Sequence, residues 1–217
     1  MHPRFQLLST VESGVTDTEI LLGSSAVLSG PLGSQIKVVL NGAALAFDAA
    51  NEQGGVGGRK IELAALDDEL KPEKALENYG KLLNDHRVFA FFGCVGPGTT
   101  STPAKLLQQS GAPSVGGYGT PYPWGEVEAV TRDYRRLAER AQVPVGYGSF
   151  EGYLNGLVMI KAIKRTGRDL MRARLHATLR ALKLRLAGMD IDFSTGATTC
   201  SRFIEMVRAT PEGRFVR

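Results

Sequence analysis

A short apolar run in the middle of the chain, Val88–Gly93, constrains the fold more than any other stretch. The run is rich in aromatic residues and does not alternate between apolar and polar positions, which is typical of a strand buried on both faces of a parallel sheet. It ends at Gly93, and the next residues, Cys94–Gly98, hold two more glycines and a proline. The sequence therefore predicts a buried β-strand that is followed by an open turn.

Two threonines follow this turn, Thr99 and Thr100. Either can cap a helix that is predicted through Ala104–Leu107 and that ends near Gly111. The N–H groups at a helix start have no partner within the helix, so beside hydroxyl groups they suit a small anion such as a carboxylate. Ligands of open α/β sheets bind beyond the carboxyl ends of the strands, where this turn would lie. The alternative is an ordinary strand-to-helix turn in which a threonine only caps the helix.

Other chemistry-bearing motifs are missing from the sequence. The glycine spacing of the turn is not GxGxxG and GxxxxGK[ST] occurs nowhere, so nucleotide binding is not favoured. The pair Asp67–Asp68 lies at the end of a predicted strand, and paired carboxylates can serve acid–base chemistry or bind an amine. They can equally be solvated strand-end acids. A small α/β enzyme with Asp67 or Asp68 as its base is therefore an alternative, but no GxSxG motif or other nucleophile supports it.

Composition limits the class of protein. The chain has 217 residues, of which 43% are hydrophobic and 22% charged, which agrees with a globular protein of one large or two small domains. No apolar run of about eighteen residues predicts a transmembrane helix, so membrane insertion is not expected. The first residues lack the apolar stretch and cleavage site of a signal peptide. Two alternatives follow: the chain stays in the cytoplasm, or a signal peptide precedes the given start.

The titratable residues predict no metal or cofactor site. Cys94, Cys200 and the three histidines are dispersed without metal-ligand spacing, and a Cys94–Cys200 disulfide can be neither predicted nor excluded. The net charge is +4, and the basic residues of 161–185 are opposed only by Asp169. Nucleic-acid binding is one interpretation of that run. Basic residues at helical spacing around a leucine stripe favour a solvated helix face instead.

The first half of the chain alternates between strand and helix patterns. The predicted strands are 19–24, 61–66, 88–93 and 113–117, and the predicted helices between them have inner positions Ile36, Val39, Leu40, Ala43, Phe47 and Ala50, then Ala75, Leu76, Tyr79, Leu82 and Leu83, then Ala104, Leu106 and Leu107. This order requires right-handed crossovers and predicts a doubly wound parallel sheet of about four strands.

The alternation of strand and helix patterns ends after Gly119. Three helices are predicted in succession, the first over 127–141, the second over 151–166, and the third carrying Leu175, Leu179, Leu182 and Leu186. The end of the chain is typical of β structure, at Ile191–Phe193, Phe203–Val207 and Phe215–Val216.

Several of these segments, in order, resemble the type I periplasmic substrate-binding proteins of ABC importers. The group that they resemble is the branched-chain amino-acid (leucine/isoleucine/valine-binding) family. The segments are Gly14–Ile20, Leu28–Pro31, Asn51–Lys60, Asp67–Asp68, Phe92–Thr100, Pro121–Trp124, Phe150–Tyr153 and Gly213–Val216. Because the matches keep their order over nearly the whole chain, they are more specific than any single glycine loop.

The resemblance implies a fold and shows one departure from it. Family members are two-lobed clamshells whose chain crosses the hinge three times, but most of lobe 2 has no counterpart here. We therefore expect an N-terminal tail at 1–18, a lobe 1 at 19–188 with the junction near 119–121, and a C-terminal β segment at 189–217 that forms a hairpin. The expected fold class is α/β, with a doubly wound parallel sheet that forms a single lobe.

The resemblance also implies where a ligand binds. In the family, lobe 1 holds the α-carboxylate and α-amino groups of the ligand from the loops that follow its strands. The residues of this chain that match those loops are Ser29, Gly96, Gly98, Thr99, Thr100, Tyr118 and Thr120. Catalytic residues, metals and cofactors are not implied.

The function that the resemblance implies is non-catalytic binding of branched-chain or related amino acids, as a truncated substrate-binding component of an ABC importer. The implied partners are the small-molecule ligand and the importer permease, and the implied location is the periplasm. A ligand-sensing α/β module and a non-functional gene remnant are alternatives, because fold alone does not assign function. A small enzyme is less favoured, and nucleic acid is not an expected partner.

Overall fold

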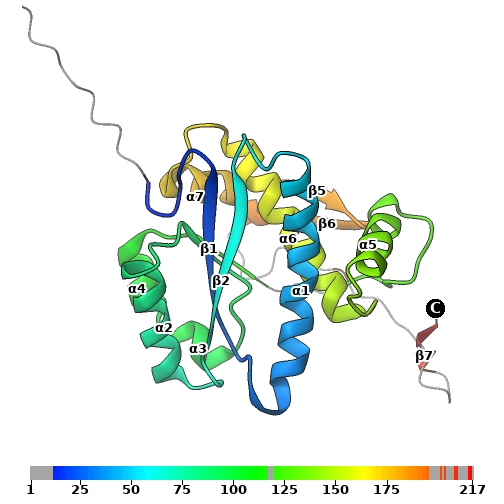
Figure 1. The fold of residues 1–217 in the computed structure, drawn as a ribbon, viewed down its shortest axis with the longest axis horizontal. Helices are drawn as coiled ribbons and strands as arrows, with labels where there is room; N and C mark the ends of the chain where they lie inside the picture. Colours follow the sequence, from blue (N-terminus) through cyan, green and yellow to red (C-terminus); the bar gives the residue numbers. More distant parts are fainter. Residues whose placement is uncertain are drawn as a thin grey trace, which may run out of the picture.

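The computed structural model of this chain describes residues 12–116, 120–195, 201, 203, 208–209 and 215–216. Strands and helices alternate along its first half (Figure 1). The strands are β1 Glu19–Ala26, β2 Lys60–Asp67, β3 Ala90–Phe92, β4 Ser114–Val115, β5 Lys183–Leu186, β6 Met189–Asp192, β7 Arg208–Ala209 and β8 Phe215–Val216. The helices are α1 Gly30–Glu52, α2 Pro72–Asn84, α3 Pro97–Ser101, α4 Ala104–Ser110, α5 Ala129–Arg140, α6 Tyr147–Thr166, α7 Arg172–Arg180 and the 3₁₀ turn η1 Phe193–Thr195.

The main sheet has four parallel strands in the order β2-β1-β3-β4. The β1–β2 ladder is long and runs from Glu19 opposite Lys60 to Ala26 opposite Asp67. The β3–β4 ladder pairs only Phe91 with Ser114 and its neighbour with Val115. Helices connect the strands, so the predicted doubly wound parallel sheet is confirmed.

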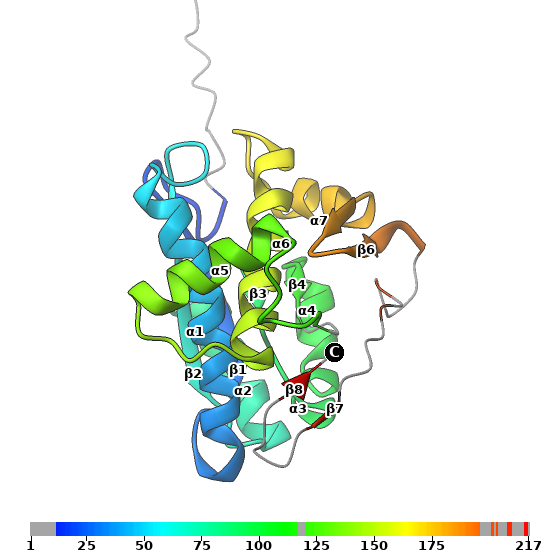
Figure 2. The same cartoon turned by 90° about the vertical axis from the view of Figure 1, so that its right-hand side faces the viewer.

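Helices cover both faces of this sheet (Figures 1 and 2). One face packs against α1 and α6, and the core on this side, which includes Ala90 and Phe92, extends to α5 and α7. The other face packs against α2 and α4, and there Phe91 joins a smaller core and stacks on Tyr79, with ring centroids 4.4 Å apart. Successive residues of β3 thus enter two different cores. This explains why the run shows no alternation of apolar and polar residues.

Helices α1 and α6 approach so closely that glycine is required at their crossing. A Cβ at Gly152 would overlap the Val39 carbonyl oxygen, and a Cβ at Gly42 would overlap the Ser149 carbonyl oxygen. A Cβ at Gly156 would lie 2.8 Å from the Cβ of Ala46. The missing side chains therefore allow the two backbones to pack against each other.

Residues 12–18, the described part of the predicted tail, pack on the sheet. Val15 is buried and forms a β-bridge with Ile20, and Leu21 N donates to Gly14 O (2.8 Å). Glu12 accepts a hydrogen bond from the backbone N–H of Arg172 at the start of α7 (2.9 Å). This segment therefore contributes contacts to the lobe.

Arg172 joins three parts of the fold. Its guanidinium donates to Val88 O (2.6 Å) and Phe89 O (3.0 Å) at the start of β3. A third bond reaches Ser110 O at the end of α4 (3.1 Å). The side chain is mostly buried, so α7 is fixed to β3 and α4 through these carbonyl groups.

The prediction that Leu182 and Leu186 lie on a helix is wrong. Helix α7 ends at Arg180, and Leu186 belongs to the antiparallel hairpin β5–β6. Leu182 lies between α7 and β5, where its carbonyl oxygen accepts a hydrogen bond from Phe193 N (3.0 Å). Its two-residue turn is Ala187–Gly188, and both have positive φ (50° and 79°), as a tight hairpin turn requires. The leucine spacing from Leu182 to Leu186 also fits an alternating strand, so the pattern was ambiguous.

The predicted C-terminal hairpin is confirmed, with an earlier start than expected. In β6, Ile191 is buried in the larger core. Phe203 packs partly buried against the same core, whereas Met206 lies outside the described residues. A second antiparallel pair, β7–β8, joins Arg208 with Val216.

Two further expectations can be compared with side-chain exposure. Leu76 was placed on the inner face of α2 but is 43% exposed, because that face is centred on Ala75, Tyr79 and Leu82. Several charges of the basic run form exposed ion pairs, such as Lys183 with Asp192 (3.0 Å).

In the described part of the chain, every helix is too short or too polar to span a bilayer.

Candidate functional site

The loops at the carboxyl ends of the four main strands form the candidate site. Because the strands are parallel, these loops meet at one edge of the sheet, at the lower end in Figure 1. The loops are 27–29 after β1, 68–71 after β2, 93–96 after β3, and Gly116 with Thr120 after β4.

Asp67 ties the loop after β1 to the loop after β2. Its Oδ1 accepts hydrogen bonds from the backbone N–H groups of Leu28 and Glu69, both at 2.9 Å. Burial acts to raise the pKa of this carboxyl, but the hydrogen bonds from the Ser29 hydroxyl and the two amides outweigh it and lower the pKa to about 2. The charged carboxylate therefore holds the entrance to α1 in place.

Asp68 lies in a fully buried polar cluster under the same edge. The Ser25 hydroxyl donates to its Oδ2 (3.0 Å) and Leu70 N donates to its Oδ1 (2.9 Å). Asn78 Nδ2 completes the cluster by donating to Asp67 O (3.0 Å). Burial raises the pKa of Asp68, and the bonds from Leu70 and Ser25 oppose this only in part.

The two carboxylates thus hold loops together, and this geometry does not favour an acid–base role. Sequence reasoning missed Ser25 and Asn78. One signal was present: Asn78 shares the inner face of α2 with Ala75 and Tyr79, so a polar side chain occurs at an apolar position. A buried polar residue of this kind requires a hydrogen-bonding partner.

The turn after β3 begins helix α3 earlier than predicted. Gly96, with φ 117°, is its N-cap and Pro97 is its first residue. The prediction that Thr99 or Thr100 caps one helix through Leu107 is therefore wrong, since α3 and α4 are separate helices. A proline favours the first helical position, which moves the helix start ahead of both threonines.

The two threonine hydroxyls instead bond back to the turn. Thr99 Oγ1 donates to Val95 O (2.7 Å), and Thr100 Oγ1 donates to Gly96 O (2.6 Å). The Thr99 side chain is only 2% exposed. Its hydroxyl therefore supports the turn, while the N–H groups of Gly98 and Thr99 lie in the first turn of α3, where a helix supplies no acceptor.

The structure brings some of the predicted residues together. Ser29 is exposed at the N-cap of α1, after β1, and Gly96 ends the loop after the neighbouring strand β3, with Gly98 in the first turn of α3. Thr120 is half-buried after β4. Tyr118 lies outside the described residues, so its position stays a prediction.

Cys94 follows β3 at the same edge. Burial raises the pKa of its thiol, and its side chain is hydrogen-bonded to Tyr79. Cys200 lies outside the described residues, so the question of a disulfide stays open. Among the described residues, no group of three histidine, cysteine or acidic side chains is arranged to hold a metal ion.

The sequence of residues 19–129 matches a family described as "Periplasmic binding protein". This span includes all four strands of the main sheet and the loops at their carboxyl ends. The Leu/Ile/Val-binding protein BraC3 of Rhizobium johnstonii (strain DSM 114642 / LMG 32736 / 3841) is 34% identical over 93 residues. The match covers 43% of this chain and 25% of BraC3, so the chain spans about a quarter of that curated relative.

Solved structures share the fold at low sequence identity. A substrate-binding periplasmic protein from Ralstonia solanacearum superposes with a TM-score of 0.82 at 16% identity, over 91% of this chain and 99% of that chain. A possible leucine/isoleucine/valine-binding protein from Rhodopirellula baltica SH 1 gives 0.74 at 14% identity, over 85% of this chain and 91% of that chain. At such identities the likeness concerns the fold.

Proposed function

The chain belongs to the periplasmic binding protein family, and from this premise we propose that it binds a branched-chain or similar amino acid for an ABC importer. The relatives are binding proteins, and the family supports a solute-binding role in ABC transport. The observation that carries the proposal is the family match itself, because residues 19–129 include every loop of the candidate site. The importer permease as partner and the periplasm as location are part of the proposal.

The ligand carboxylate binds at the first turn of α3 in this proposal. The N–H groups of Gly98 and Thr99 donate to it, and we assign the hydroxyls of Ser29 and Thr120, from the loops after β1 and β4, to the same site. Pro97 and Gly96 keep this turn open, and the Thr99 hydroxyl holds it by bonding to Val95 O. The role of Thr99 in binding is therefore support of the turn through its side chain and contact through its backbone.

A single lobe binds its ligand on one side only. Two-lobed proteins of this kind close around a hinge and remove water from the ligand. When one lobe binds alone, the charged groups of the ligand stay in competition with solvent. If the absent contacts contribute ~4 kcal/mol, affinity falls about a thousandfold relative to a closed two-lobed site, so we expect weak or unmeasurable binding.

Nuclear magnetic resonance tests this proposal, because it detects weak binding residue by residue. The isotope-labelled chain is titrated with leucine, isoleucine, valine and a wider amino-acid panel. We expect amide shift changes in the loops 27–33 and 93–101, with little change in α5 or α7. Shift changes outside the carboxyl edge, or none at saturating ligand, would contradict the proposed site, and micromolar affinity would contradict the argument from a single lobe.

Two variants test whether ligand binding depends on the Thr99 hydroxyl, which supports the turn after β3. Thr99→Val removes the hydroxyl that donates to Val95 O, so we expect the shift changes on adding leucine to disappear while the fold remains. Thr102→Val is the matched control, because Thr102 is exposed at the far end of α3. Equal loss of binding in both variants would contradict the assigned role of Thr99.

A further inference from the structure

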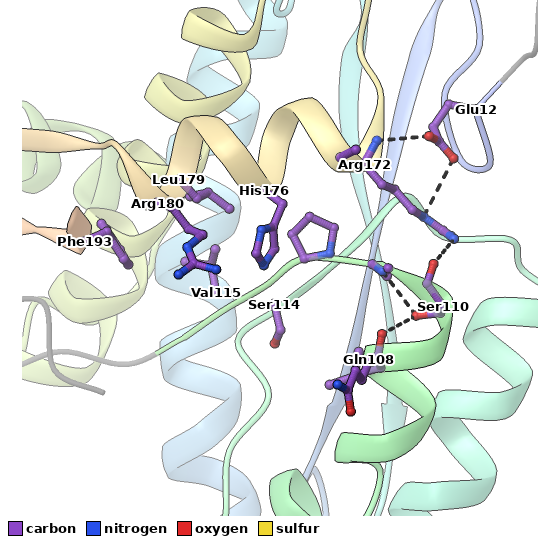
Figure 3. A pocket seen from close by; sticks show the side chains of 15 residues that line it. Glu12, Gln108, Ser110, Ser114, Val115, Arg172, His176, Leu179, Arg180 and Phe193 are labelled. Carbon is purple, nitrogen blue, oxygen red and sulfur yellow. Dashed lines mark hydrogen bonds and ion pairs between the residues drawn. The ribbon is translucent and has the colours of Figure 1, made fainter. Parts of the chain in front are cut away.

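A cavity of about 880 Å³ lies away from the candidate solute site, between β4 and α7 (Figure 3). Its floor is the end of α4 with the extended segment 112–115, and its wall is one side of α7. We call this cavity the β4 groove. Its volume is within the range of ligand and peptide sites.

The strand that borders the β4 groove is the last strand of the sheet. Only its inner side is paired, since Phe91 N donates to Pro113 O (2.7 Å) and Gly93 N donates to Val115 O (2.9 Å). Backbone groups of successive strand residues point to opposite sides, so the N–H and C=O of Ser114 point away from β3. Among the described residues, no strand pairs with that outer side. The groove therefore offers one donor and one acceptor at a sheet edge.

The wall of the β4 groove is basic. His176 and Arg180 lie one turn apart on α7, and Figure 3 shows both side chains directed toward the strand segment. Arg180 forms no ion pair with any of the described residues. Arg172 also borders the groove, but its guanidinium is committed to backbone carbonyls and to Glu12. The available positive charge thus lies at the Arg180 end.

Apolar side chains line the rest of the groove. They are Leu107 from α4, Val115 from β4, and Leu179 and Phe193 from the opposite wall. An extended peptide has side chains that alternate between two directions, so it can contact apolar and basic groups while its backbone pairs with β4. A compact small molecule would leave the Ser114 backbone groups unused.

We propose that the β4 groove binds an extended acidic segment of another protein, which adds a fifth strand to the sheet beside β4. The acidic character follows from the charge of Arg180. A second copy of this chain is a poorer occupant, because it would bring the same cations to the same edge. The proposal does not depend on the solute site, which lies at the carboxyl ends of the strands.

Fluorescence anisotropy tests this proposal with the full chain. The probe is a short labelled peptide of alternating valine and glutamate, with blocked ends. Two comparison peptides carry lysine in place of glutamate, or N-methyl groups on every amide. We expect binding of the glutamate peptide and a loss of at least about tenfold for each comparison peptide, since each lacks one of the required interactions. Equal binding of the N-methylated peptide, or no binding of the glutamate peptide, would overturn the proposal.

Protein variants locate the binding. Arg180→Glu reverses the charge inside the groove, and Arg174→Glu makes the same change on α7 outside it, where Arg174 pairs with Asp169. Ser114→Pro removes the outward N–H. We expect weaker binding by about tenfold for Arg180→Glu and Ser114→Pro, and little change for Arg174→Glu.

Three outcomes of the variant series would overturn the proposal. The first is an equal effect of the two arginine changes, because a general charge effect would then explain binding. The second is unchanged binding by Arg180→Glu. This result would overturn the proposal even if Ser114→Pro fails to fold. The third is a dimer in sedimentation that Ser114→Pro converts to a monomer, because a second copy would then occupy the edge.

Discussion

The two faces of the main sheet are stabilised in different ways. The α1–α6 face has a large apolar core in which the helices meet through glycine, at Gly42, Gly152 and Gly156. The α2–α4 face has a smaller core, and at the carboxyl edge of the sheet lies the polar cluster around Asp68. One face is therefore held by close packing, and the other partly by hydrogen bonds.

The difference separates the scaffold from the candidate site. Close packing of α1 on α6 does not depend on pH and leaves little room for movement. The hydrogen bonds of Asp67 and Asp68 hold the loops at the carboxyl edge, where the ligand is proposed to bind. Loops on a rigid body are the usual position for binding residues. Mutations on the two faces should therefore differ in size and in pH dependence.

The largest effect is expected at the α1–α6 crossing. Gly152→Val places side-chain atoms against the Val39 carbonyl, so the helices must separate. We expect a loss of more than about 3 kcal/mol in the free energy of unfolding, or failure to fold. Urea unfolding followed by circular dichroism measures this loss.

Gly148→Ala is the matched control on the same helix. A Cβ there would meet Val38 Cγ1 at 3.5 Å, which is an ordinary contact. Since alanine also favours helix, we expect a change within about 1 kcal/mol, in the stabilising direction. Similar losses for both variants would contradict the argument that the close backbone contact at Gly152 sets the size of the effect.

A smaller loss is expected in the polar cluster. Asp68→Ala leaves the buried Ser25 hydroxyl without its acceptor and removes the acceptor of Leu70 N–H, so we expect a loss of about 2–3 kcal/mol. Asp85→Ala at the exposed end of α2 serves as the control, with an expected change within about 0.5 kcal/mol. If thermal unfolding gave equal values for the two variants, the cluster would contribute nothing specific.

The smallest effect is expected at Asp67 and depends on pH. The folded pKa of about 2 is below the ordinary value of 3.8, so the stabilisation is fully present above about pH 4 and is lost as the pH falls toward 2. We expect the wild type to exceed Asp67→Asn by about 1–2 kcal/mol at neutral pH, with solvent screening taken into account. Urea unfolding at a series of pH values measures this difference.

For Asp68→Asn we expect a stability difference from the wild type that changes with pH in the opposite direction. Burial raises the pKa of Asp68, so ionisation above the ordinary value of 3.8 opposes folding. The wild type should therefore lose stability relative to Asp68→Asn as the pH rises. Parallel pH profiles for the Asp67 and Asp68 variants would contradict the assignment of opposite shifts.

Much of the architecture could be predicted from the sequence. The apolar runs and amphipathic spacings predicted four parallel strands with helices between them, because burial on two faces leaves a local pattern in the residues. The glycine and proline run after β3 indicated the open turn at the carboxyl edge. Residues Ser29, Gly96 and Gly98 were placed at that edge by resemblance, and the structure brings their loops to neighbouring strands.

The positions of single hydroxyl groups could not be predicted from the sequence in the same way. Thr99 and Thr100 were expected at a helix cap, but Pro97 starts the helix earlier and their hydroxyls bond to the turn. A cap and a back-bonded position differ by a few residues, which a pattern of apolar spacing does not resolve. The role of the Asp67 carboxylate likewise depends on Leu28, 39 residues away.

The sequence by itself determined the class of fold and the family, because apolar periodicity and ordered motifs are properties of neighbouring residues. Only the tertiary structure decided that the helix ends before Leu182 and that Leu186 belongs to a hairpin, since their spacing suits both a helix and a strand. It also decided that Arg172 joins β3, α4 and α7, and that β4 borders an open groove. These features depend on contacts between distant segments, for which local pattern carries no signal.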